Sequence, residues 1–72
     1  MFIDASALVA LIAEEEDGAE LVERLRRAES RYTSAIAIYE ATLALLRIRK
    51  TTIDSLGQIV NTFLARFHVE TA

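Results

Sequence analysis

The sequence predicts an α/β fold with the element order β-α-α-β-α-α-β. Three observations lead to this prediction. Short β-favouring segments stand at residues 2–4, 31–33 and 67–70, the stretches between them repeat apolar residues at helical spacing, and no proline interrupts them. Strands that alternate with helical segments favour a parallel sheet with right-handed crossovers.

The chain opens on Phe-Ile-Asp at residues 2–4, a brief apolar segment that predicts a buried strand. A helical face follows it at Leu8, Leu11 and Ile12. Asp4 or Ser6 can cap this helix, because both residue types accept hydrogen bonds from the first free backbone amides. The acidic run at residues 14–16 predicts a solvated joint.

A capping box opens the second predicted helix, since Glu20 follows Asp17 at a distance of three residues. Its apolar face consists of Leu21, Leu25 and Ala28. Residues 31–33, Arg-Tyr-Thr, then predict the second strand.

Ser34 is a good cap for a third helix, predicted over roughly residues 35–49. This helix is apolar nearly all round, at Ile36, Ile38, Tyr39, Leu43, Leu45, Leu46 and Ile48. A helix with apolar residues on every side is expected in the interior, between layers.

Thr51 or Thr52 can cap a fourth helix. Its apolar stripe consists of Ile53, Leu56, Val60, Phe63 and Leu64. Gly57 inside this helix predicts close packing, since glycine otherwise weakens a helix. The alternating residues 67–70 predict the third strand, with no later segment to cover it.

The bulk composition limits the possible functions. With 72 residues the chain is one small domain, yet its hydrophobic fraction of 53% is high for that size, which favours a partner surface. The net charge of −3 argues against bulk electrostatic binding of nucleic acid or anionic membranes, although a metal ion can still bridge to phosphates. The absence of cysteine excludes disulfides and thiolate metal sites.

The apolar start is not a signal peptide, because it lacks a basic region and carries Asp4. It is also shorter than the ~20 residues that span a bilayer. We therefore expect no membrane partner and a cytoplasmic location.

Two acidic residues are candidates for chemistry. Asp4 ends the first predicted strand, at the sheet edge where α/β proteins bind ligands. Glu40 is the only acid in the third helix and stands among apolar residues, where an unpaired carboxylate is costly to bury. Both segments start near the same edge, so the two carboxylates can converge on a hard cation, Mg²⁺ or Mn²⁺, with Ser6 adding a hydroxyl.

Simpler interpretations stay open. Asp4 can serve only as a helix cap, and Glu40 can reach the surface or pair with Arg47 or Arg49. An aspartyl nucleophile for phosphoryl transfer usually has a second acid two residues later, where this chain has Ser6.

Two further features are interpreted as structural. His68, the single histidine, lies in the third predicted strand, away from both acids in sequence. The basic clusters at residues 24–27 and 47–50 predict solvated helix ends, with contact to RNA or to an acidic partner as the alternative.

The segments FIDASALVALI, EEEDGAELVERL and RYTSAIAIYEATLAL resemble the amino-terminal half of a PIN domain, in particular the VapC-type toxin ribonucleases of toxin–antitoxin systems. The resemblance implies a three-layer fold with short parallel strands and flanking helices, of which residues 1–72 are expected to form about half. It also implies an endoribonuclease that uses Mg²⁺ or Mn²⁺, with Asp4 and Glu40 as metal-binding catalytic carboxylates and Ser6 beside the metal.

The resemblance implies three partners: an RNA substrate, a cognate antitoxin that lies along the helices, and a second copy of the toxin. The family's later acids are absent from this sequence, so we expect the chain alone to be inactive. The alternative is a non-catalytic helical module for self-association or antitoxin binding.

Overall fold

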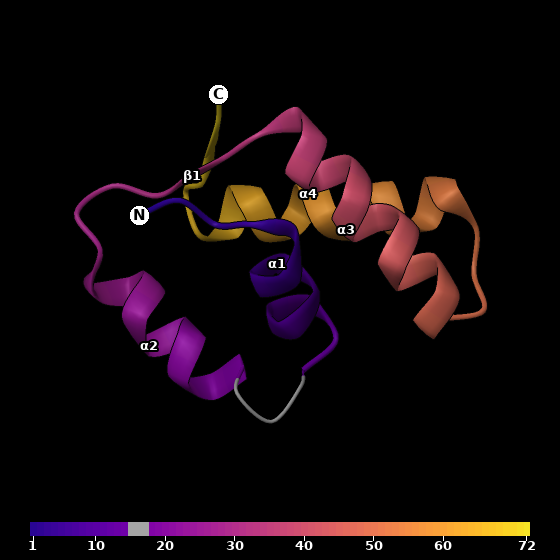
Figure 1. Ribbon diagram of the computed structural model, residues 1–72, viewed down its shortest axis with the longest axis horizontal. Coiled ribbons are helices and arrows are strands. Elements are labelled where there is room, and N and C mark those ends of the chain that lie inside the picture. Colours follow the sequence, from indigo (N-terminus) through magenta and orange to yellow (C-terminus); the bar gives the residue numbers. More distant parts are fainter. Residues whose placement is uncertain (15–17) are drawn as a thin grey trace.

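The computed structural model describes residues 1–14 and 18–72 and shows helices packed around a small parallel sheet (Figure 1). The elements are α1 (Ala5–Ile12), α2 (Gly18–Arg27), β1 (Tyr32–Thr33), α3 (Ala35–Ile48), α4 (Ile53–Arg66) and β2 (Glu70–Thr71). The predicted α/β class is confirmed. Across the described residues, no helix is both long and apolar enough to cross a membrane.

The sheet is parallel, and β1 is its central strand. Tyr32 pairs with Glu70 of β2 on one side and forms a parallel bridge with Phe2 on the other. The N–H of Ile3 donates to the Tyr32 carbonyl over 2.8 Å, and the N–H of Tyr32 donates to the Met1 carbonyl over 3.0 Å. The strand segments therefore lie side by side in chain order.

The third strand is displaced from its predicted position. It occupies Glu70–Thr71, whereas residues 67–70 were expected. Phe67 instead caps α4, with its ring 4.8 Å from that of Phe63, and His68 adopts a positive φ of 52° in the following turn. The contact between residues four apart continues the helical pattern, so the alternation at 67–70 did not mark a strand.

Three helices begin at the side-chain caps expected from the sequence. Asp4, Ser34 and Thr52 each accept a hydrogen bond from the backbone N–H three residues later. The acceptor–donor distances are 2.8 Å, 3.0 Å and 3.1 Å, respectively. The capping box at Asp17 and most of the acidic joint lie outside the described residues, although Glu14 is exposed as expected.

The core lies between the sheet and the helices. It consists of Ile3, Leu8, Leu11, Ile12, Leu25, Ala37, Ala41, Leu45, Leu56, Val60 and Leu64. The predicted face of α1 is thus confirmed, and α2 contributes Leu25. In α4, the stripe is confirmed at its centre, but Ile53 at its beginning is exposed.

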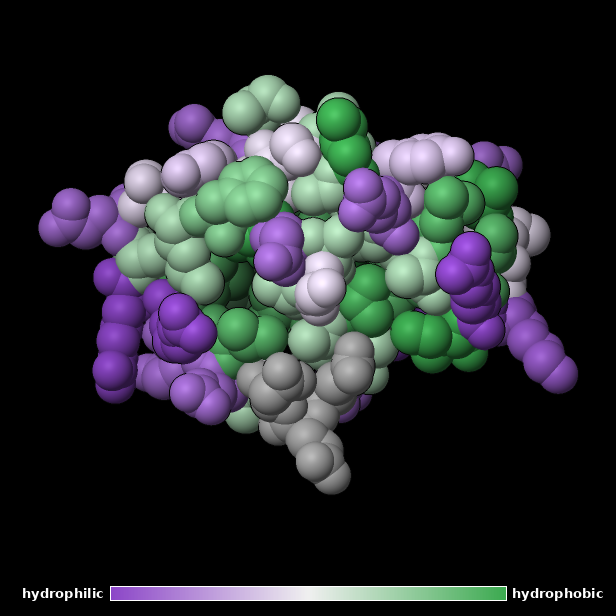
Figure 2. All heavy atoms as spheres, in the orientation of Figure 1, coloured by the Kyte–Doolittle hydropathy of each residue, from purple (hydrophilic) through white to green (hydrophobic). Residues whose placement is uncertain are grey.

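The interior position predicted for α3 is wrong. Only Ala37, Ala41 and Leu45 are buried along this helix, at a spacing of four residues, and they face α1 and α4. Ile36 and Tyr39 are 71% and 65% exposed. Figure 2 shows apolar side chains at the surface on the face that carries α1 and α3. The helix lies at the surface and packs through a narrow stripe of mostly small side chains.

The two glycines differ from the sequence-based expectation. A Cβ atom added to Gly57 would meet no atom within 4 Å, so the predicted close packing is wrong. Gly18 is the position of close approach, because a Cβ there would lie 3.1 Å from the Ala10 carbonyl oxygen. The beginning of α2 can therefore pack tightly against the backbone of α1.

Two arginines join separate elements through backbone carbonyls. The Nε, Nη1 and Nη2 atoms of Arg31 donate to the carbonyls of Leu25, Phe67 and Arg26 at 2.6, 2.9 and 3.3 Å. Arg49 donates to the Ile12 carbonyl at 3.0 Å. The basic cluster at residues 47–50 is thus more than a solvated helix end, since Arg49 ties the loop after α3 to the end of α1.

Candidate metal centre

Asp4 lies where the first strand segment passes into α1. Its backbone is extended, with φ −80° and ψ 175°, and its Oδ1 accepts the Ala7 N–H at 2.8 Å. The helix-capping interpretation is therefore correct. Oδ1 serves this cap, which leaves Oδ2 available to a further ligand, and the side chain is exposed.

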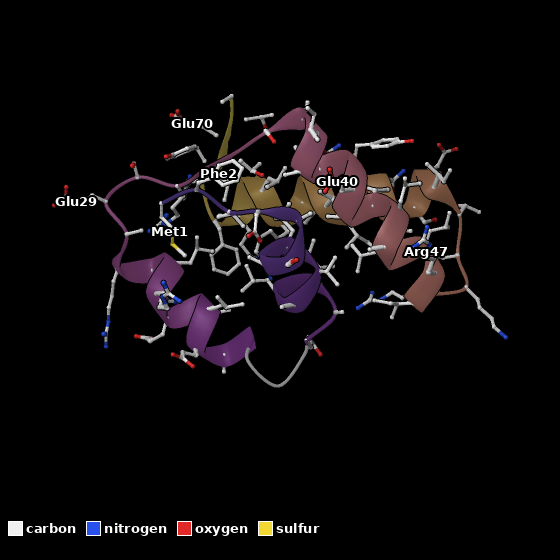
Figure 3. The ribbon with its side chains drawn as sticks, in the orientation of Figure 1. Met1, Phe2, Glu29, Glu40, Arg47 and Glu70 are labelled. Atoms are coloured by element: carbon white, nitrogen blue, oxygen red, sulfur yellow. The ribbon has the colours of Figure 1, made fainter. Side chains whose placement is uncertain are left out.

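Glu40 lies in the first half of α3 (Figure 3). It is exposed, as is Tyr39, which precedes it in the sequence. Glu40 thus reaches the surface, as one of the two interpretations had it, and the burial argument for a metal role does not hold, because α3 is not an interior helix. Its carboxylate is hydrated and needs no cation to offset a burial cost. A metal-binding role for Glu40 therefore depends on the residues that surround it.

Glu40 and Ser6 come together at one surface hollow. The hollow has a volume of about 350 Å³ and is lined by Ala5, Ser6, Val9, Glu40 and Ala44. α1 and α3 form its two walls, and Asp4 lies two residues before Ser6 at the beginning of α1. Asp4 is next to the hollow in sequence but is not among its lining residues.

The comparison with protein families identifies the family to which this chain belongs. The family model of the PIN domain matches residues 1–71. The chain belongs to the PIN-domain family. Comparisons with curated proteins and with solved structures found no match. PIN domains are generally metal-dependent nucleases, so a nuclease-like function is the coarse inference that the family supports.

The donors of this PIN domain suit a hard divalent cation. Asp4 and Glu40 offer carboxylate oxygens and Ser6 a hydroxyl, the ligand type that Mg²⁺ and Mn²⁺ prefer. Mg²⁺ commonly uses one or two carboxylates and keeps several waters. Within residues 1–14 and 18–72, no group of three or more His, Cys, Asp or Glu side chains is placed to hold a metal ion. The chemistry of these oxygen donors therefore suits Mg²⁺ or Mn²⁺, and the described residues supply few of them.

The other polar residues singled out in the sequence lie elsewhere. His68 is exposed in the turn before β2 and lines a different hollow, beside Tyr32 and Glu70. Among the described residues, the lining of the Ser6–Glu40 hollow is otherwise apolar, at Ala5, Val9 and Ala44, so the sequence analysis missed none of the donors described there. It did miss Arg31, whose hydrogen bonds connect elements far apart in the chain.

Proposed function

We propose that this PIN domain is part of a VapC-type toxin, a metal-dependent endoribonuclease that acts on RNA in the cytoplasm. Asp4 and Glu40 hold Mg²⁺ or Mn²⁺ in this proposal. The observation that carries it is the match of the PIN family model to residues 1–71, together with the oxygen donors at the α1–α3 hollow.

The bound cation supplies activation of water and stabilisation of charge at a phosphodiester. The residues of the chain hold and orient the components. The hydrogen bond from the Ala7 N–H fixes the Asp4 carboxylate, so Oδ2 has a defined position at the beginning of α1. Glu40 projects from a neighbouring helix, and the Ser6 hydroxyl between the two elements can orient a water molecule.

Metal binding is the direct test of the two proposed ligands. A Mn²⁺ titration followed by electron paramagnetic resonance should show that Asp4→Asn and Glu40→Gln each weaken binding by about tenfold or more. Asp54→Asn is the matched control, because Asp54 is an exposed acid in the first turn of α4. Equal affinities of all three variants and the unmodified chain would exclude Asp4 and Glu40 as ligands.

RNA cleavage tests the activity separately. We expect no cleavage when the chain alone, in molar excess over RNA, is incubated with Mn²⁺, because two carboxylates are fewer than the sites of such nucleases employ. Site-specific cleavage that disappears in both Asp4→Asn and Glu40→Gln would contradict the expected inactivity and assign catalysis to this chain. Cleavage that persists in both variants would contradict the proposed site.

A groove near the end of α1 supports the antitoxin part of the proposal. It has a volume of about 310 Å³ and lies between α1, α2 and α4. Its apolar lining consists of Leu11, Ile12, Val22, Ile59, Phe63 and Phe67. An amphipathic antitoxin segment can place its apolar residues in such a groove.

Two neighbouring positions of α4 give a controlled test of antitoxin binding. Thr62 is exposed and lines the groove, whereas the adjacent Asn61 is exposed and does not. In a calorimetric titration with a candidate antitoxin peptide, Thr62→Arg should abolish binding and Asn61→Arg should preserve it. Equal effects of the two substitutions would place the antitoxin elsewhere.

The alternative function is a non-catalytic interaction module. The exposed apolar residues of α3 favour it, because an uncovered apolar surface is typical of an interface. The metal titration discriminates between the two functions. The nuclease requires Asp4 and Glu40 to bind Mn²⁺, whereas a non-catalytic module does not.

A further inference from the structure

Helix α3 carries its two charged residues on one face. Within Ala35–Ile48, Glu40 is the single acidic residue and Arg47 is the single basic one. They are seven residues apart, which is two helical turns, so their side chains leave the helix in nearly the same direction, about 10.5 Å apart along its axis. Figure 3 labels both residues, with Glu40 in the first half of α3 and Arg47 close to its end. A cation therefore lies in line with a proposed metal ligand.

The hollow between α1 and α3 extends along α3 in the direction of Arg47. Its lining on α3 consists of Glu40 and Ala44, which lie one turn apart. Arg47 follows three residues after Ala44 and occupies the next turn of the same face. Because the methyl group of Ala44 is short, it does not close the hollow on the side of Arg47. An extended ligand that starts at Glu40 can thus continue to the guanidinium.

The Arg47 side chain has no structural role that the described residues reveal. Arg49, two residues later, donates to the Ile12 carbonyl at 3.0 Å and joins the end of α3 to α1. Arg47 is exposed, and within residues 1–14 and 18–72 its guanidinium makes no hydrogen bond or ion pair. Glu40 is two turns away, farther than the single turn over which helical ion pairs form. The N–H groups of Arg47 are therefore available to a ligand.

We propose that Arg47 binds an RNA phosphate that neighbours the cleaved phosphodiester, an inference that rests on the proposed nuclease function. A guanidinium matches the geometry of phosphate oxygens with two parallel hydrogen bonds. Such contacts fix the position of a nucleic acid strand without reading its bases. Arg47 is thus a positioning residue, which holds the RNA along the α1–α3 hollow while the cleaved phosphate lies at Asp4 and Glu40.

The charge of the whole chain gives this single arginine its importance. Since the net charge is −3, the protein does not attract RNA through a broad basic surface. The basic cluster at residues 24–27 belongs to α2, whereas the described lining of the hollow comes from α1 and α3. Arg66 lines the separate groove between α1, α2 and α4. An acidic protein segment can also pair with an arginine, but RNA is favoured because the adjoining hollow is the proposed place of a phosphodiester.

RNA binding tests the contact, because we expect the chain alone not to cleave RNA. Fluorescence anisotropy of a labelled single-stranded oligouridylate gives the affinity at constant Mn²⁺, while KCl is raised from about 50 to about 200 mM. Arg47→Gln should weaken binding by about threefold at low salt, as for one exposed ionic contact. The slope of log affinity against log salt should become shallower by about 0.7, the value for one phosphate contact with a single strand. A general loss of stability would not change this slope in that way.

Two further variants serve as controls. Arg24→Gln removes the same charge at an exposed position in the last turn of α2, and it should leave the slope unchanged. Arg47→Lys keeps the charge, so it should preserve the slope, although lysine lacks the two parallel hydrogen bonds of arginine. Circular dichroism verifies that each variant is folded. An unmodified chain that does not bind RNA, or equal slope changes in Arg47→Gln and Arg24→Gln, would overturn the proposal.

The Mn²⁺ titration separates the failure of this contact from the failure of the proposed metal site. Arg47→Gln should leave the Mn²⁺ affinity unchanged, because a guanidinium is not a metal ligand. Mn²⁺ binding that depends on Asp4 and Glu40, combined with an unchanged salt slope in Arg47→Gln, would overturn the Arg47 contact alone. Mn²⁺ binding that is independent of both acids would overturn the metal site, whereas a shallower slope in Arg47→Gln would still establish the phosphate contact.

Competition identifies the class of ligand. Unlabelled oligouridylate should displace the labelled RNA, and an oligoglutamate peptide of equal charge should displace it much less. Equal displacement by the peptide, lost together with RNA binding in Arg47→Gln, would overturn the assignment to RNA and make an acidic protein the ligand of Arg47.

Discussion

Asp4 combines two roles at the level of a single residue, a helix cap and a proposed metal ligand. Oδ1 accepts the Ala7 N–H, so the cap is established, whereas the metal role is a proposal. Asparagine keeps the capping oxygen but loses the negative charge, and alanine loses both. The two substitutions therefore separate the roles.

We predict that Asp4→Ala lowers the free energy of unfolding by about 1 kcal/mol through loss of the cap. Asp4→Asn should leave the stability within about 0.5 kcal/mol, because asparagine caps as well as aspartate. Urea unfolding followed by circular dichroism measures both values. A loss with asparagine as large as that with alanine would show that the charge, and not the cap, stabilises α1.

Glu40 shows what the sequence around a single residue can and cannot predict. The sequence singled out Glu40 because it is the only acid among apolar residues, but the structure shows these neighbours partly exposed. The position was selected for a reason that does not hold, and the hollow shared with Ser6 is an independent reason to keep it. Asp4 was predictable because a cap depends only on adjacent residues.

At the level of elements, the two glycines respond in opposite ways to the same substitution. Gly57→Ala should raise the free energy of unfolding by about 1 kcal/mol, because the helix gains propensity and the added Cβ meets no atom. Gly18→Ala should destabilise, since its Cβ would press on the Ala10 carbonyl oxygen at 3.1 Å. Thermal unfolding of both variants tests this, and stabilisation by both would contradict the close approach of α1 and α2.

Arg31 links the ends of α2 and α4, and its removal should cost more than that of any exposed arginine. Arg31→Met leaves the Phe67 carbonyl without its donor and the Leu25 carbonyl with only the Ala28 N–H at 3.3 Å, and we predict a loss of about 2–3 kcal/mol in unfolding free energy. Arg24→Met, at an exposed position of α2, is the control and should change stability by less than about 0.5 kcal/mol. Chemical denaturation distinguishes these outcomes, and equal losses would show that Arg31 is replaceable.

The elements also show which parts of the fold the sequence can predict. The cap at Ser34 and the bounds of α3, to within one residue, follow from neighbouring residues, so they were predicted, as was a cap of α4 at Thr51 or Thr52. The link through Arg31, the close approach at Gly18 and the exposure of Ile36 depend on residues far apart in the chain. Local patterns do not contain this information, because a helix that is apolar on all sides can still lie at the surface.

At the level of the whole molecule, the exposed apolar residues predict self-association. Ile48 at the end of α3 and Ile53 at the beginning of α4 are 56% and 58% exposed, on either side of a short connection. Together with Ile36 and Tyr39 they leave a large apolar area in contact with water. This chain should therefore associate, as was expected from its high hydrophobic fraction.

We predict that light scattering of the chain gives a mass above the 8.0 kDa of a monomer, and that Ile48→Lys lowers it. Lysine is compatible with the last turn of α3, where a positive charge suits the helix dipole. Asn61→Lys adds the same charge to an exposed position of α4 and should leave the mass unchanged. A monomeric mass of the unmodified chain would contradict the prediction.

The central place of β1 has a consequence for how the molecule opens. Its two residues connect the first segment of the chain to the last, through the bonds Ile3–Tyr32 and Ala72–Thr33. If either neighbour separates from β1, only one pair of very short strand segments is left, and such a pair is marginally stable at best. Hydrogen–deuterium exchange should accordingly find the amides of Ile3 and Tyr32 released at one common rate, as a single cooperative unit.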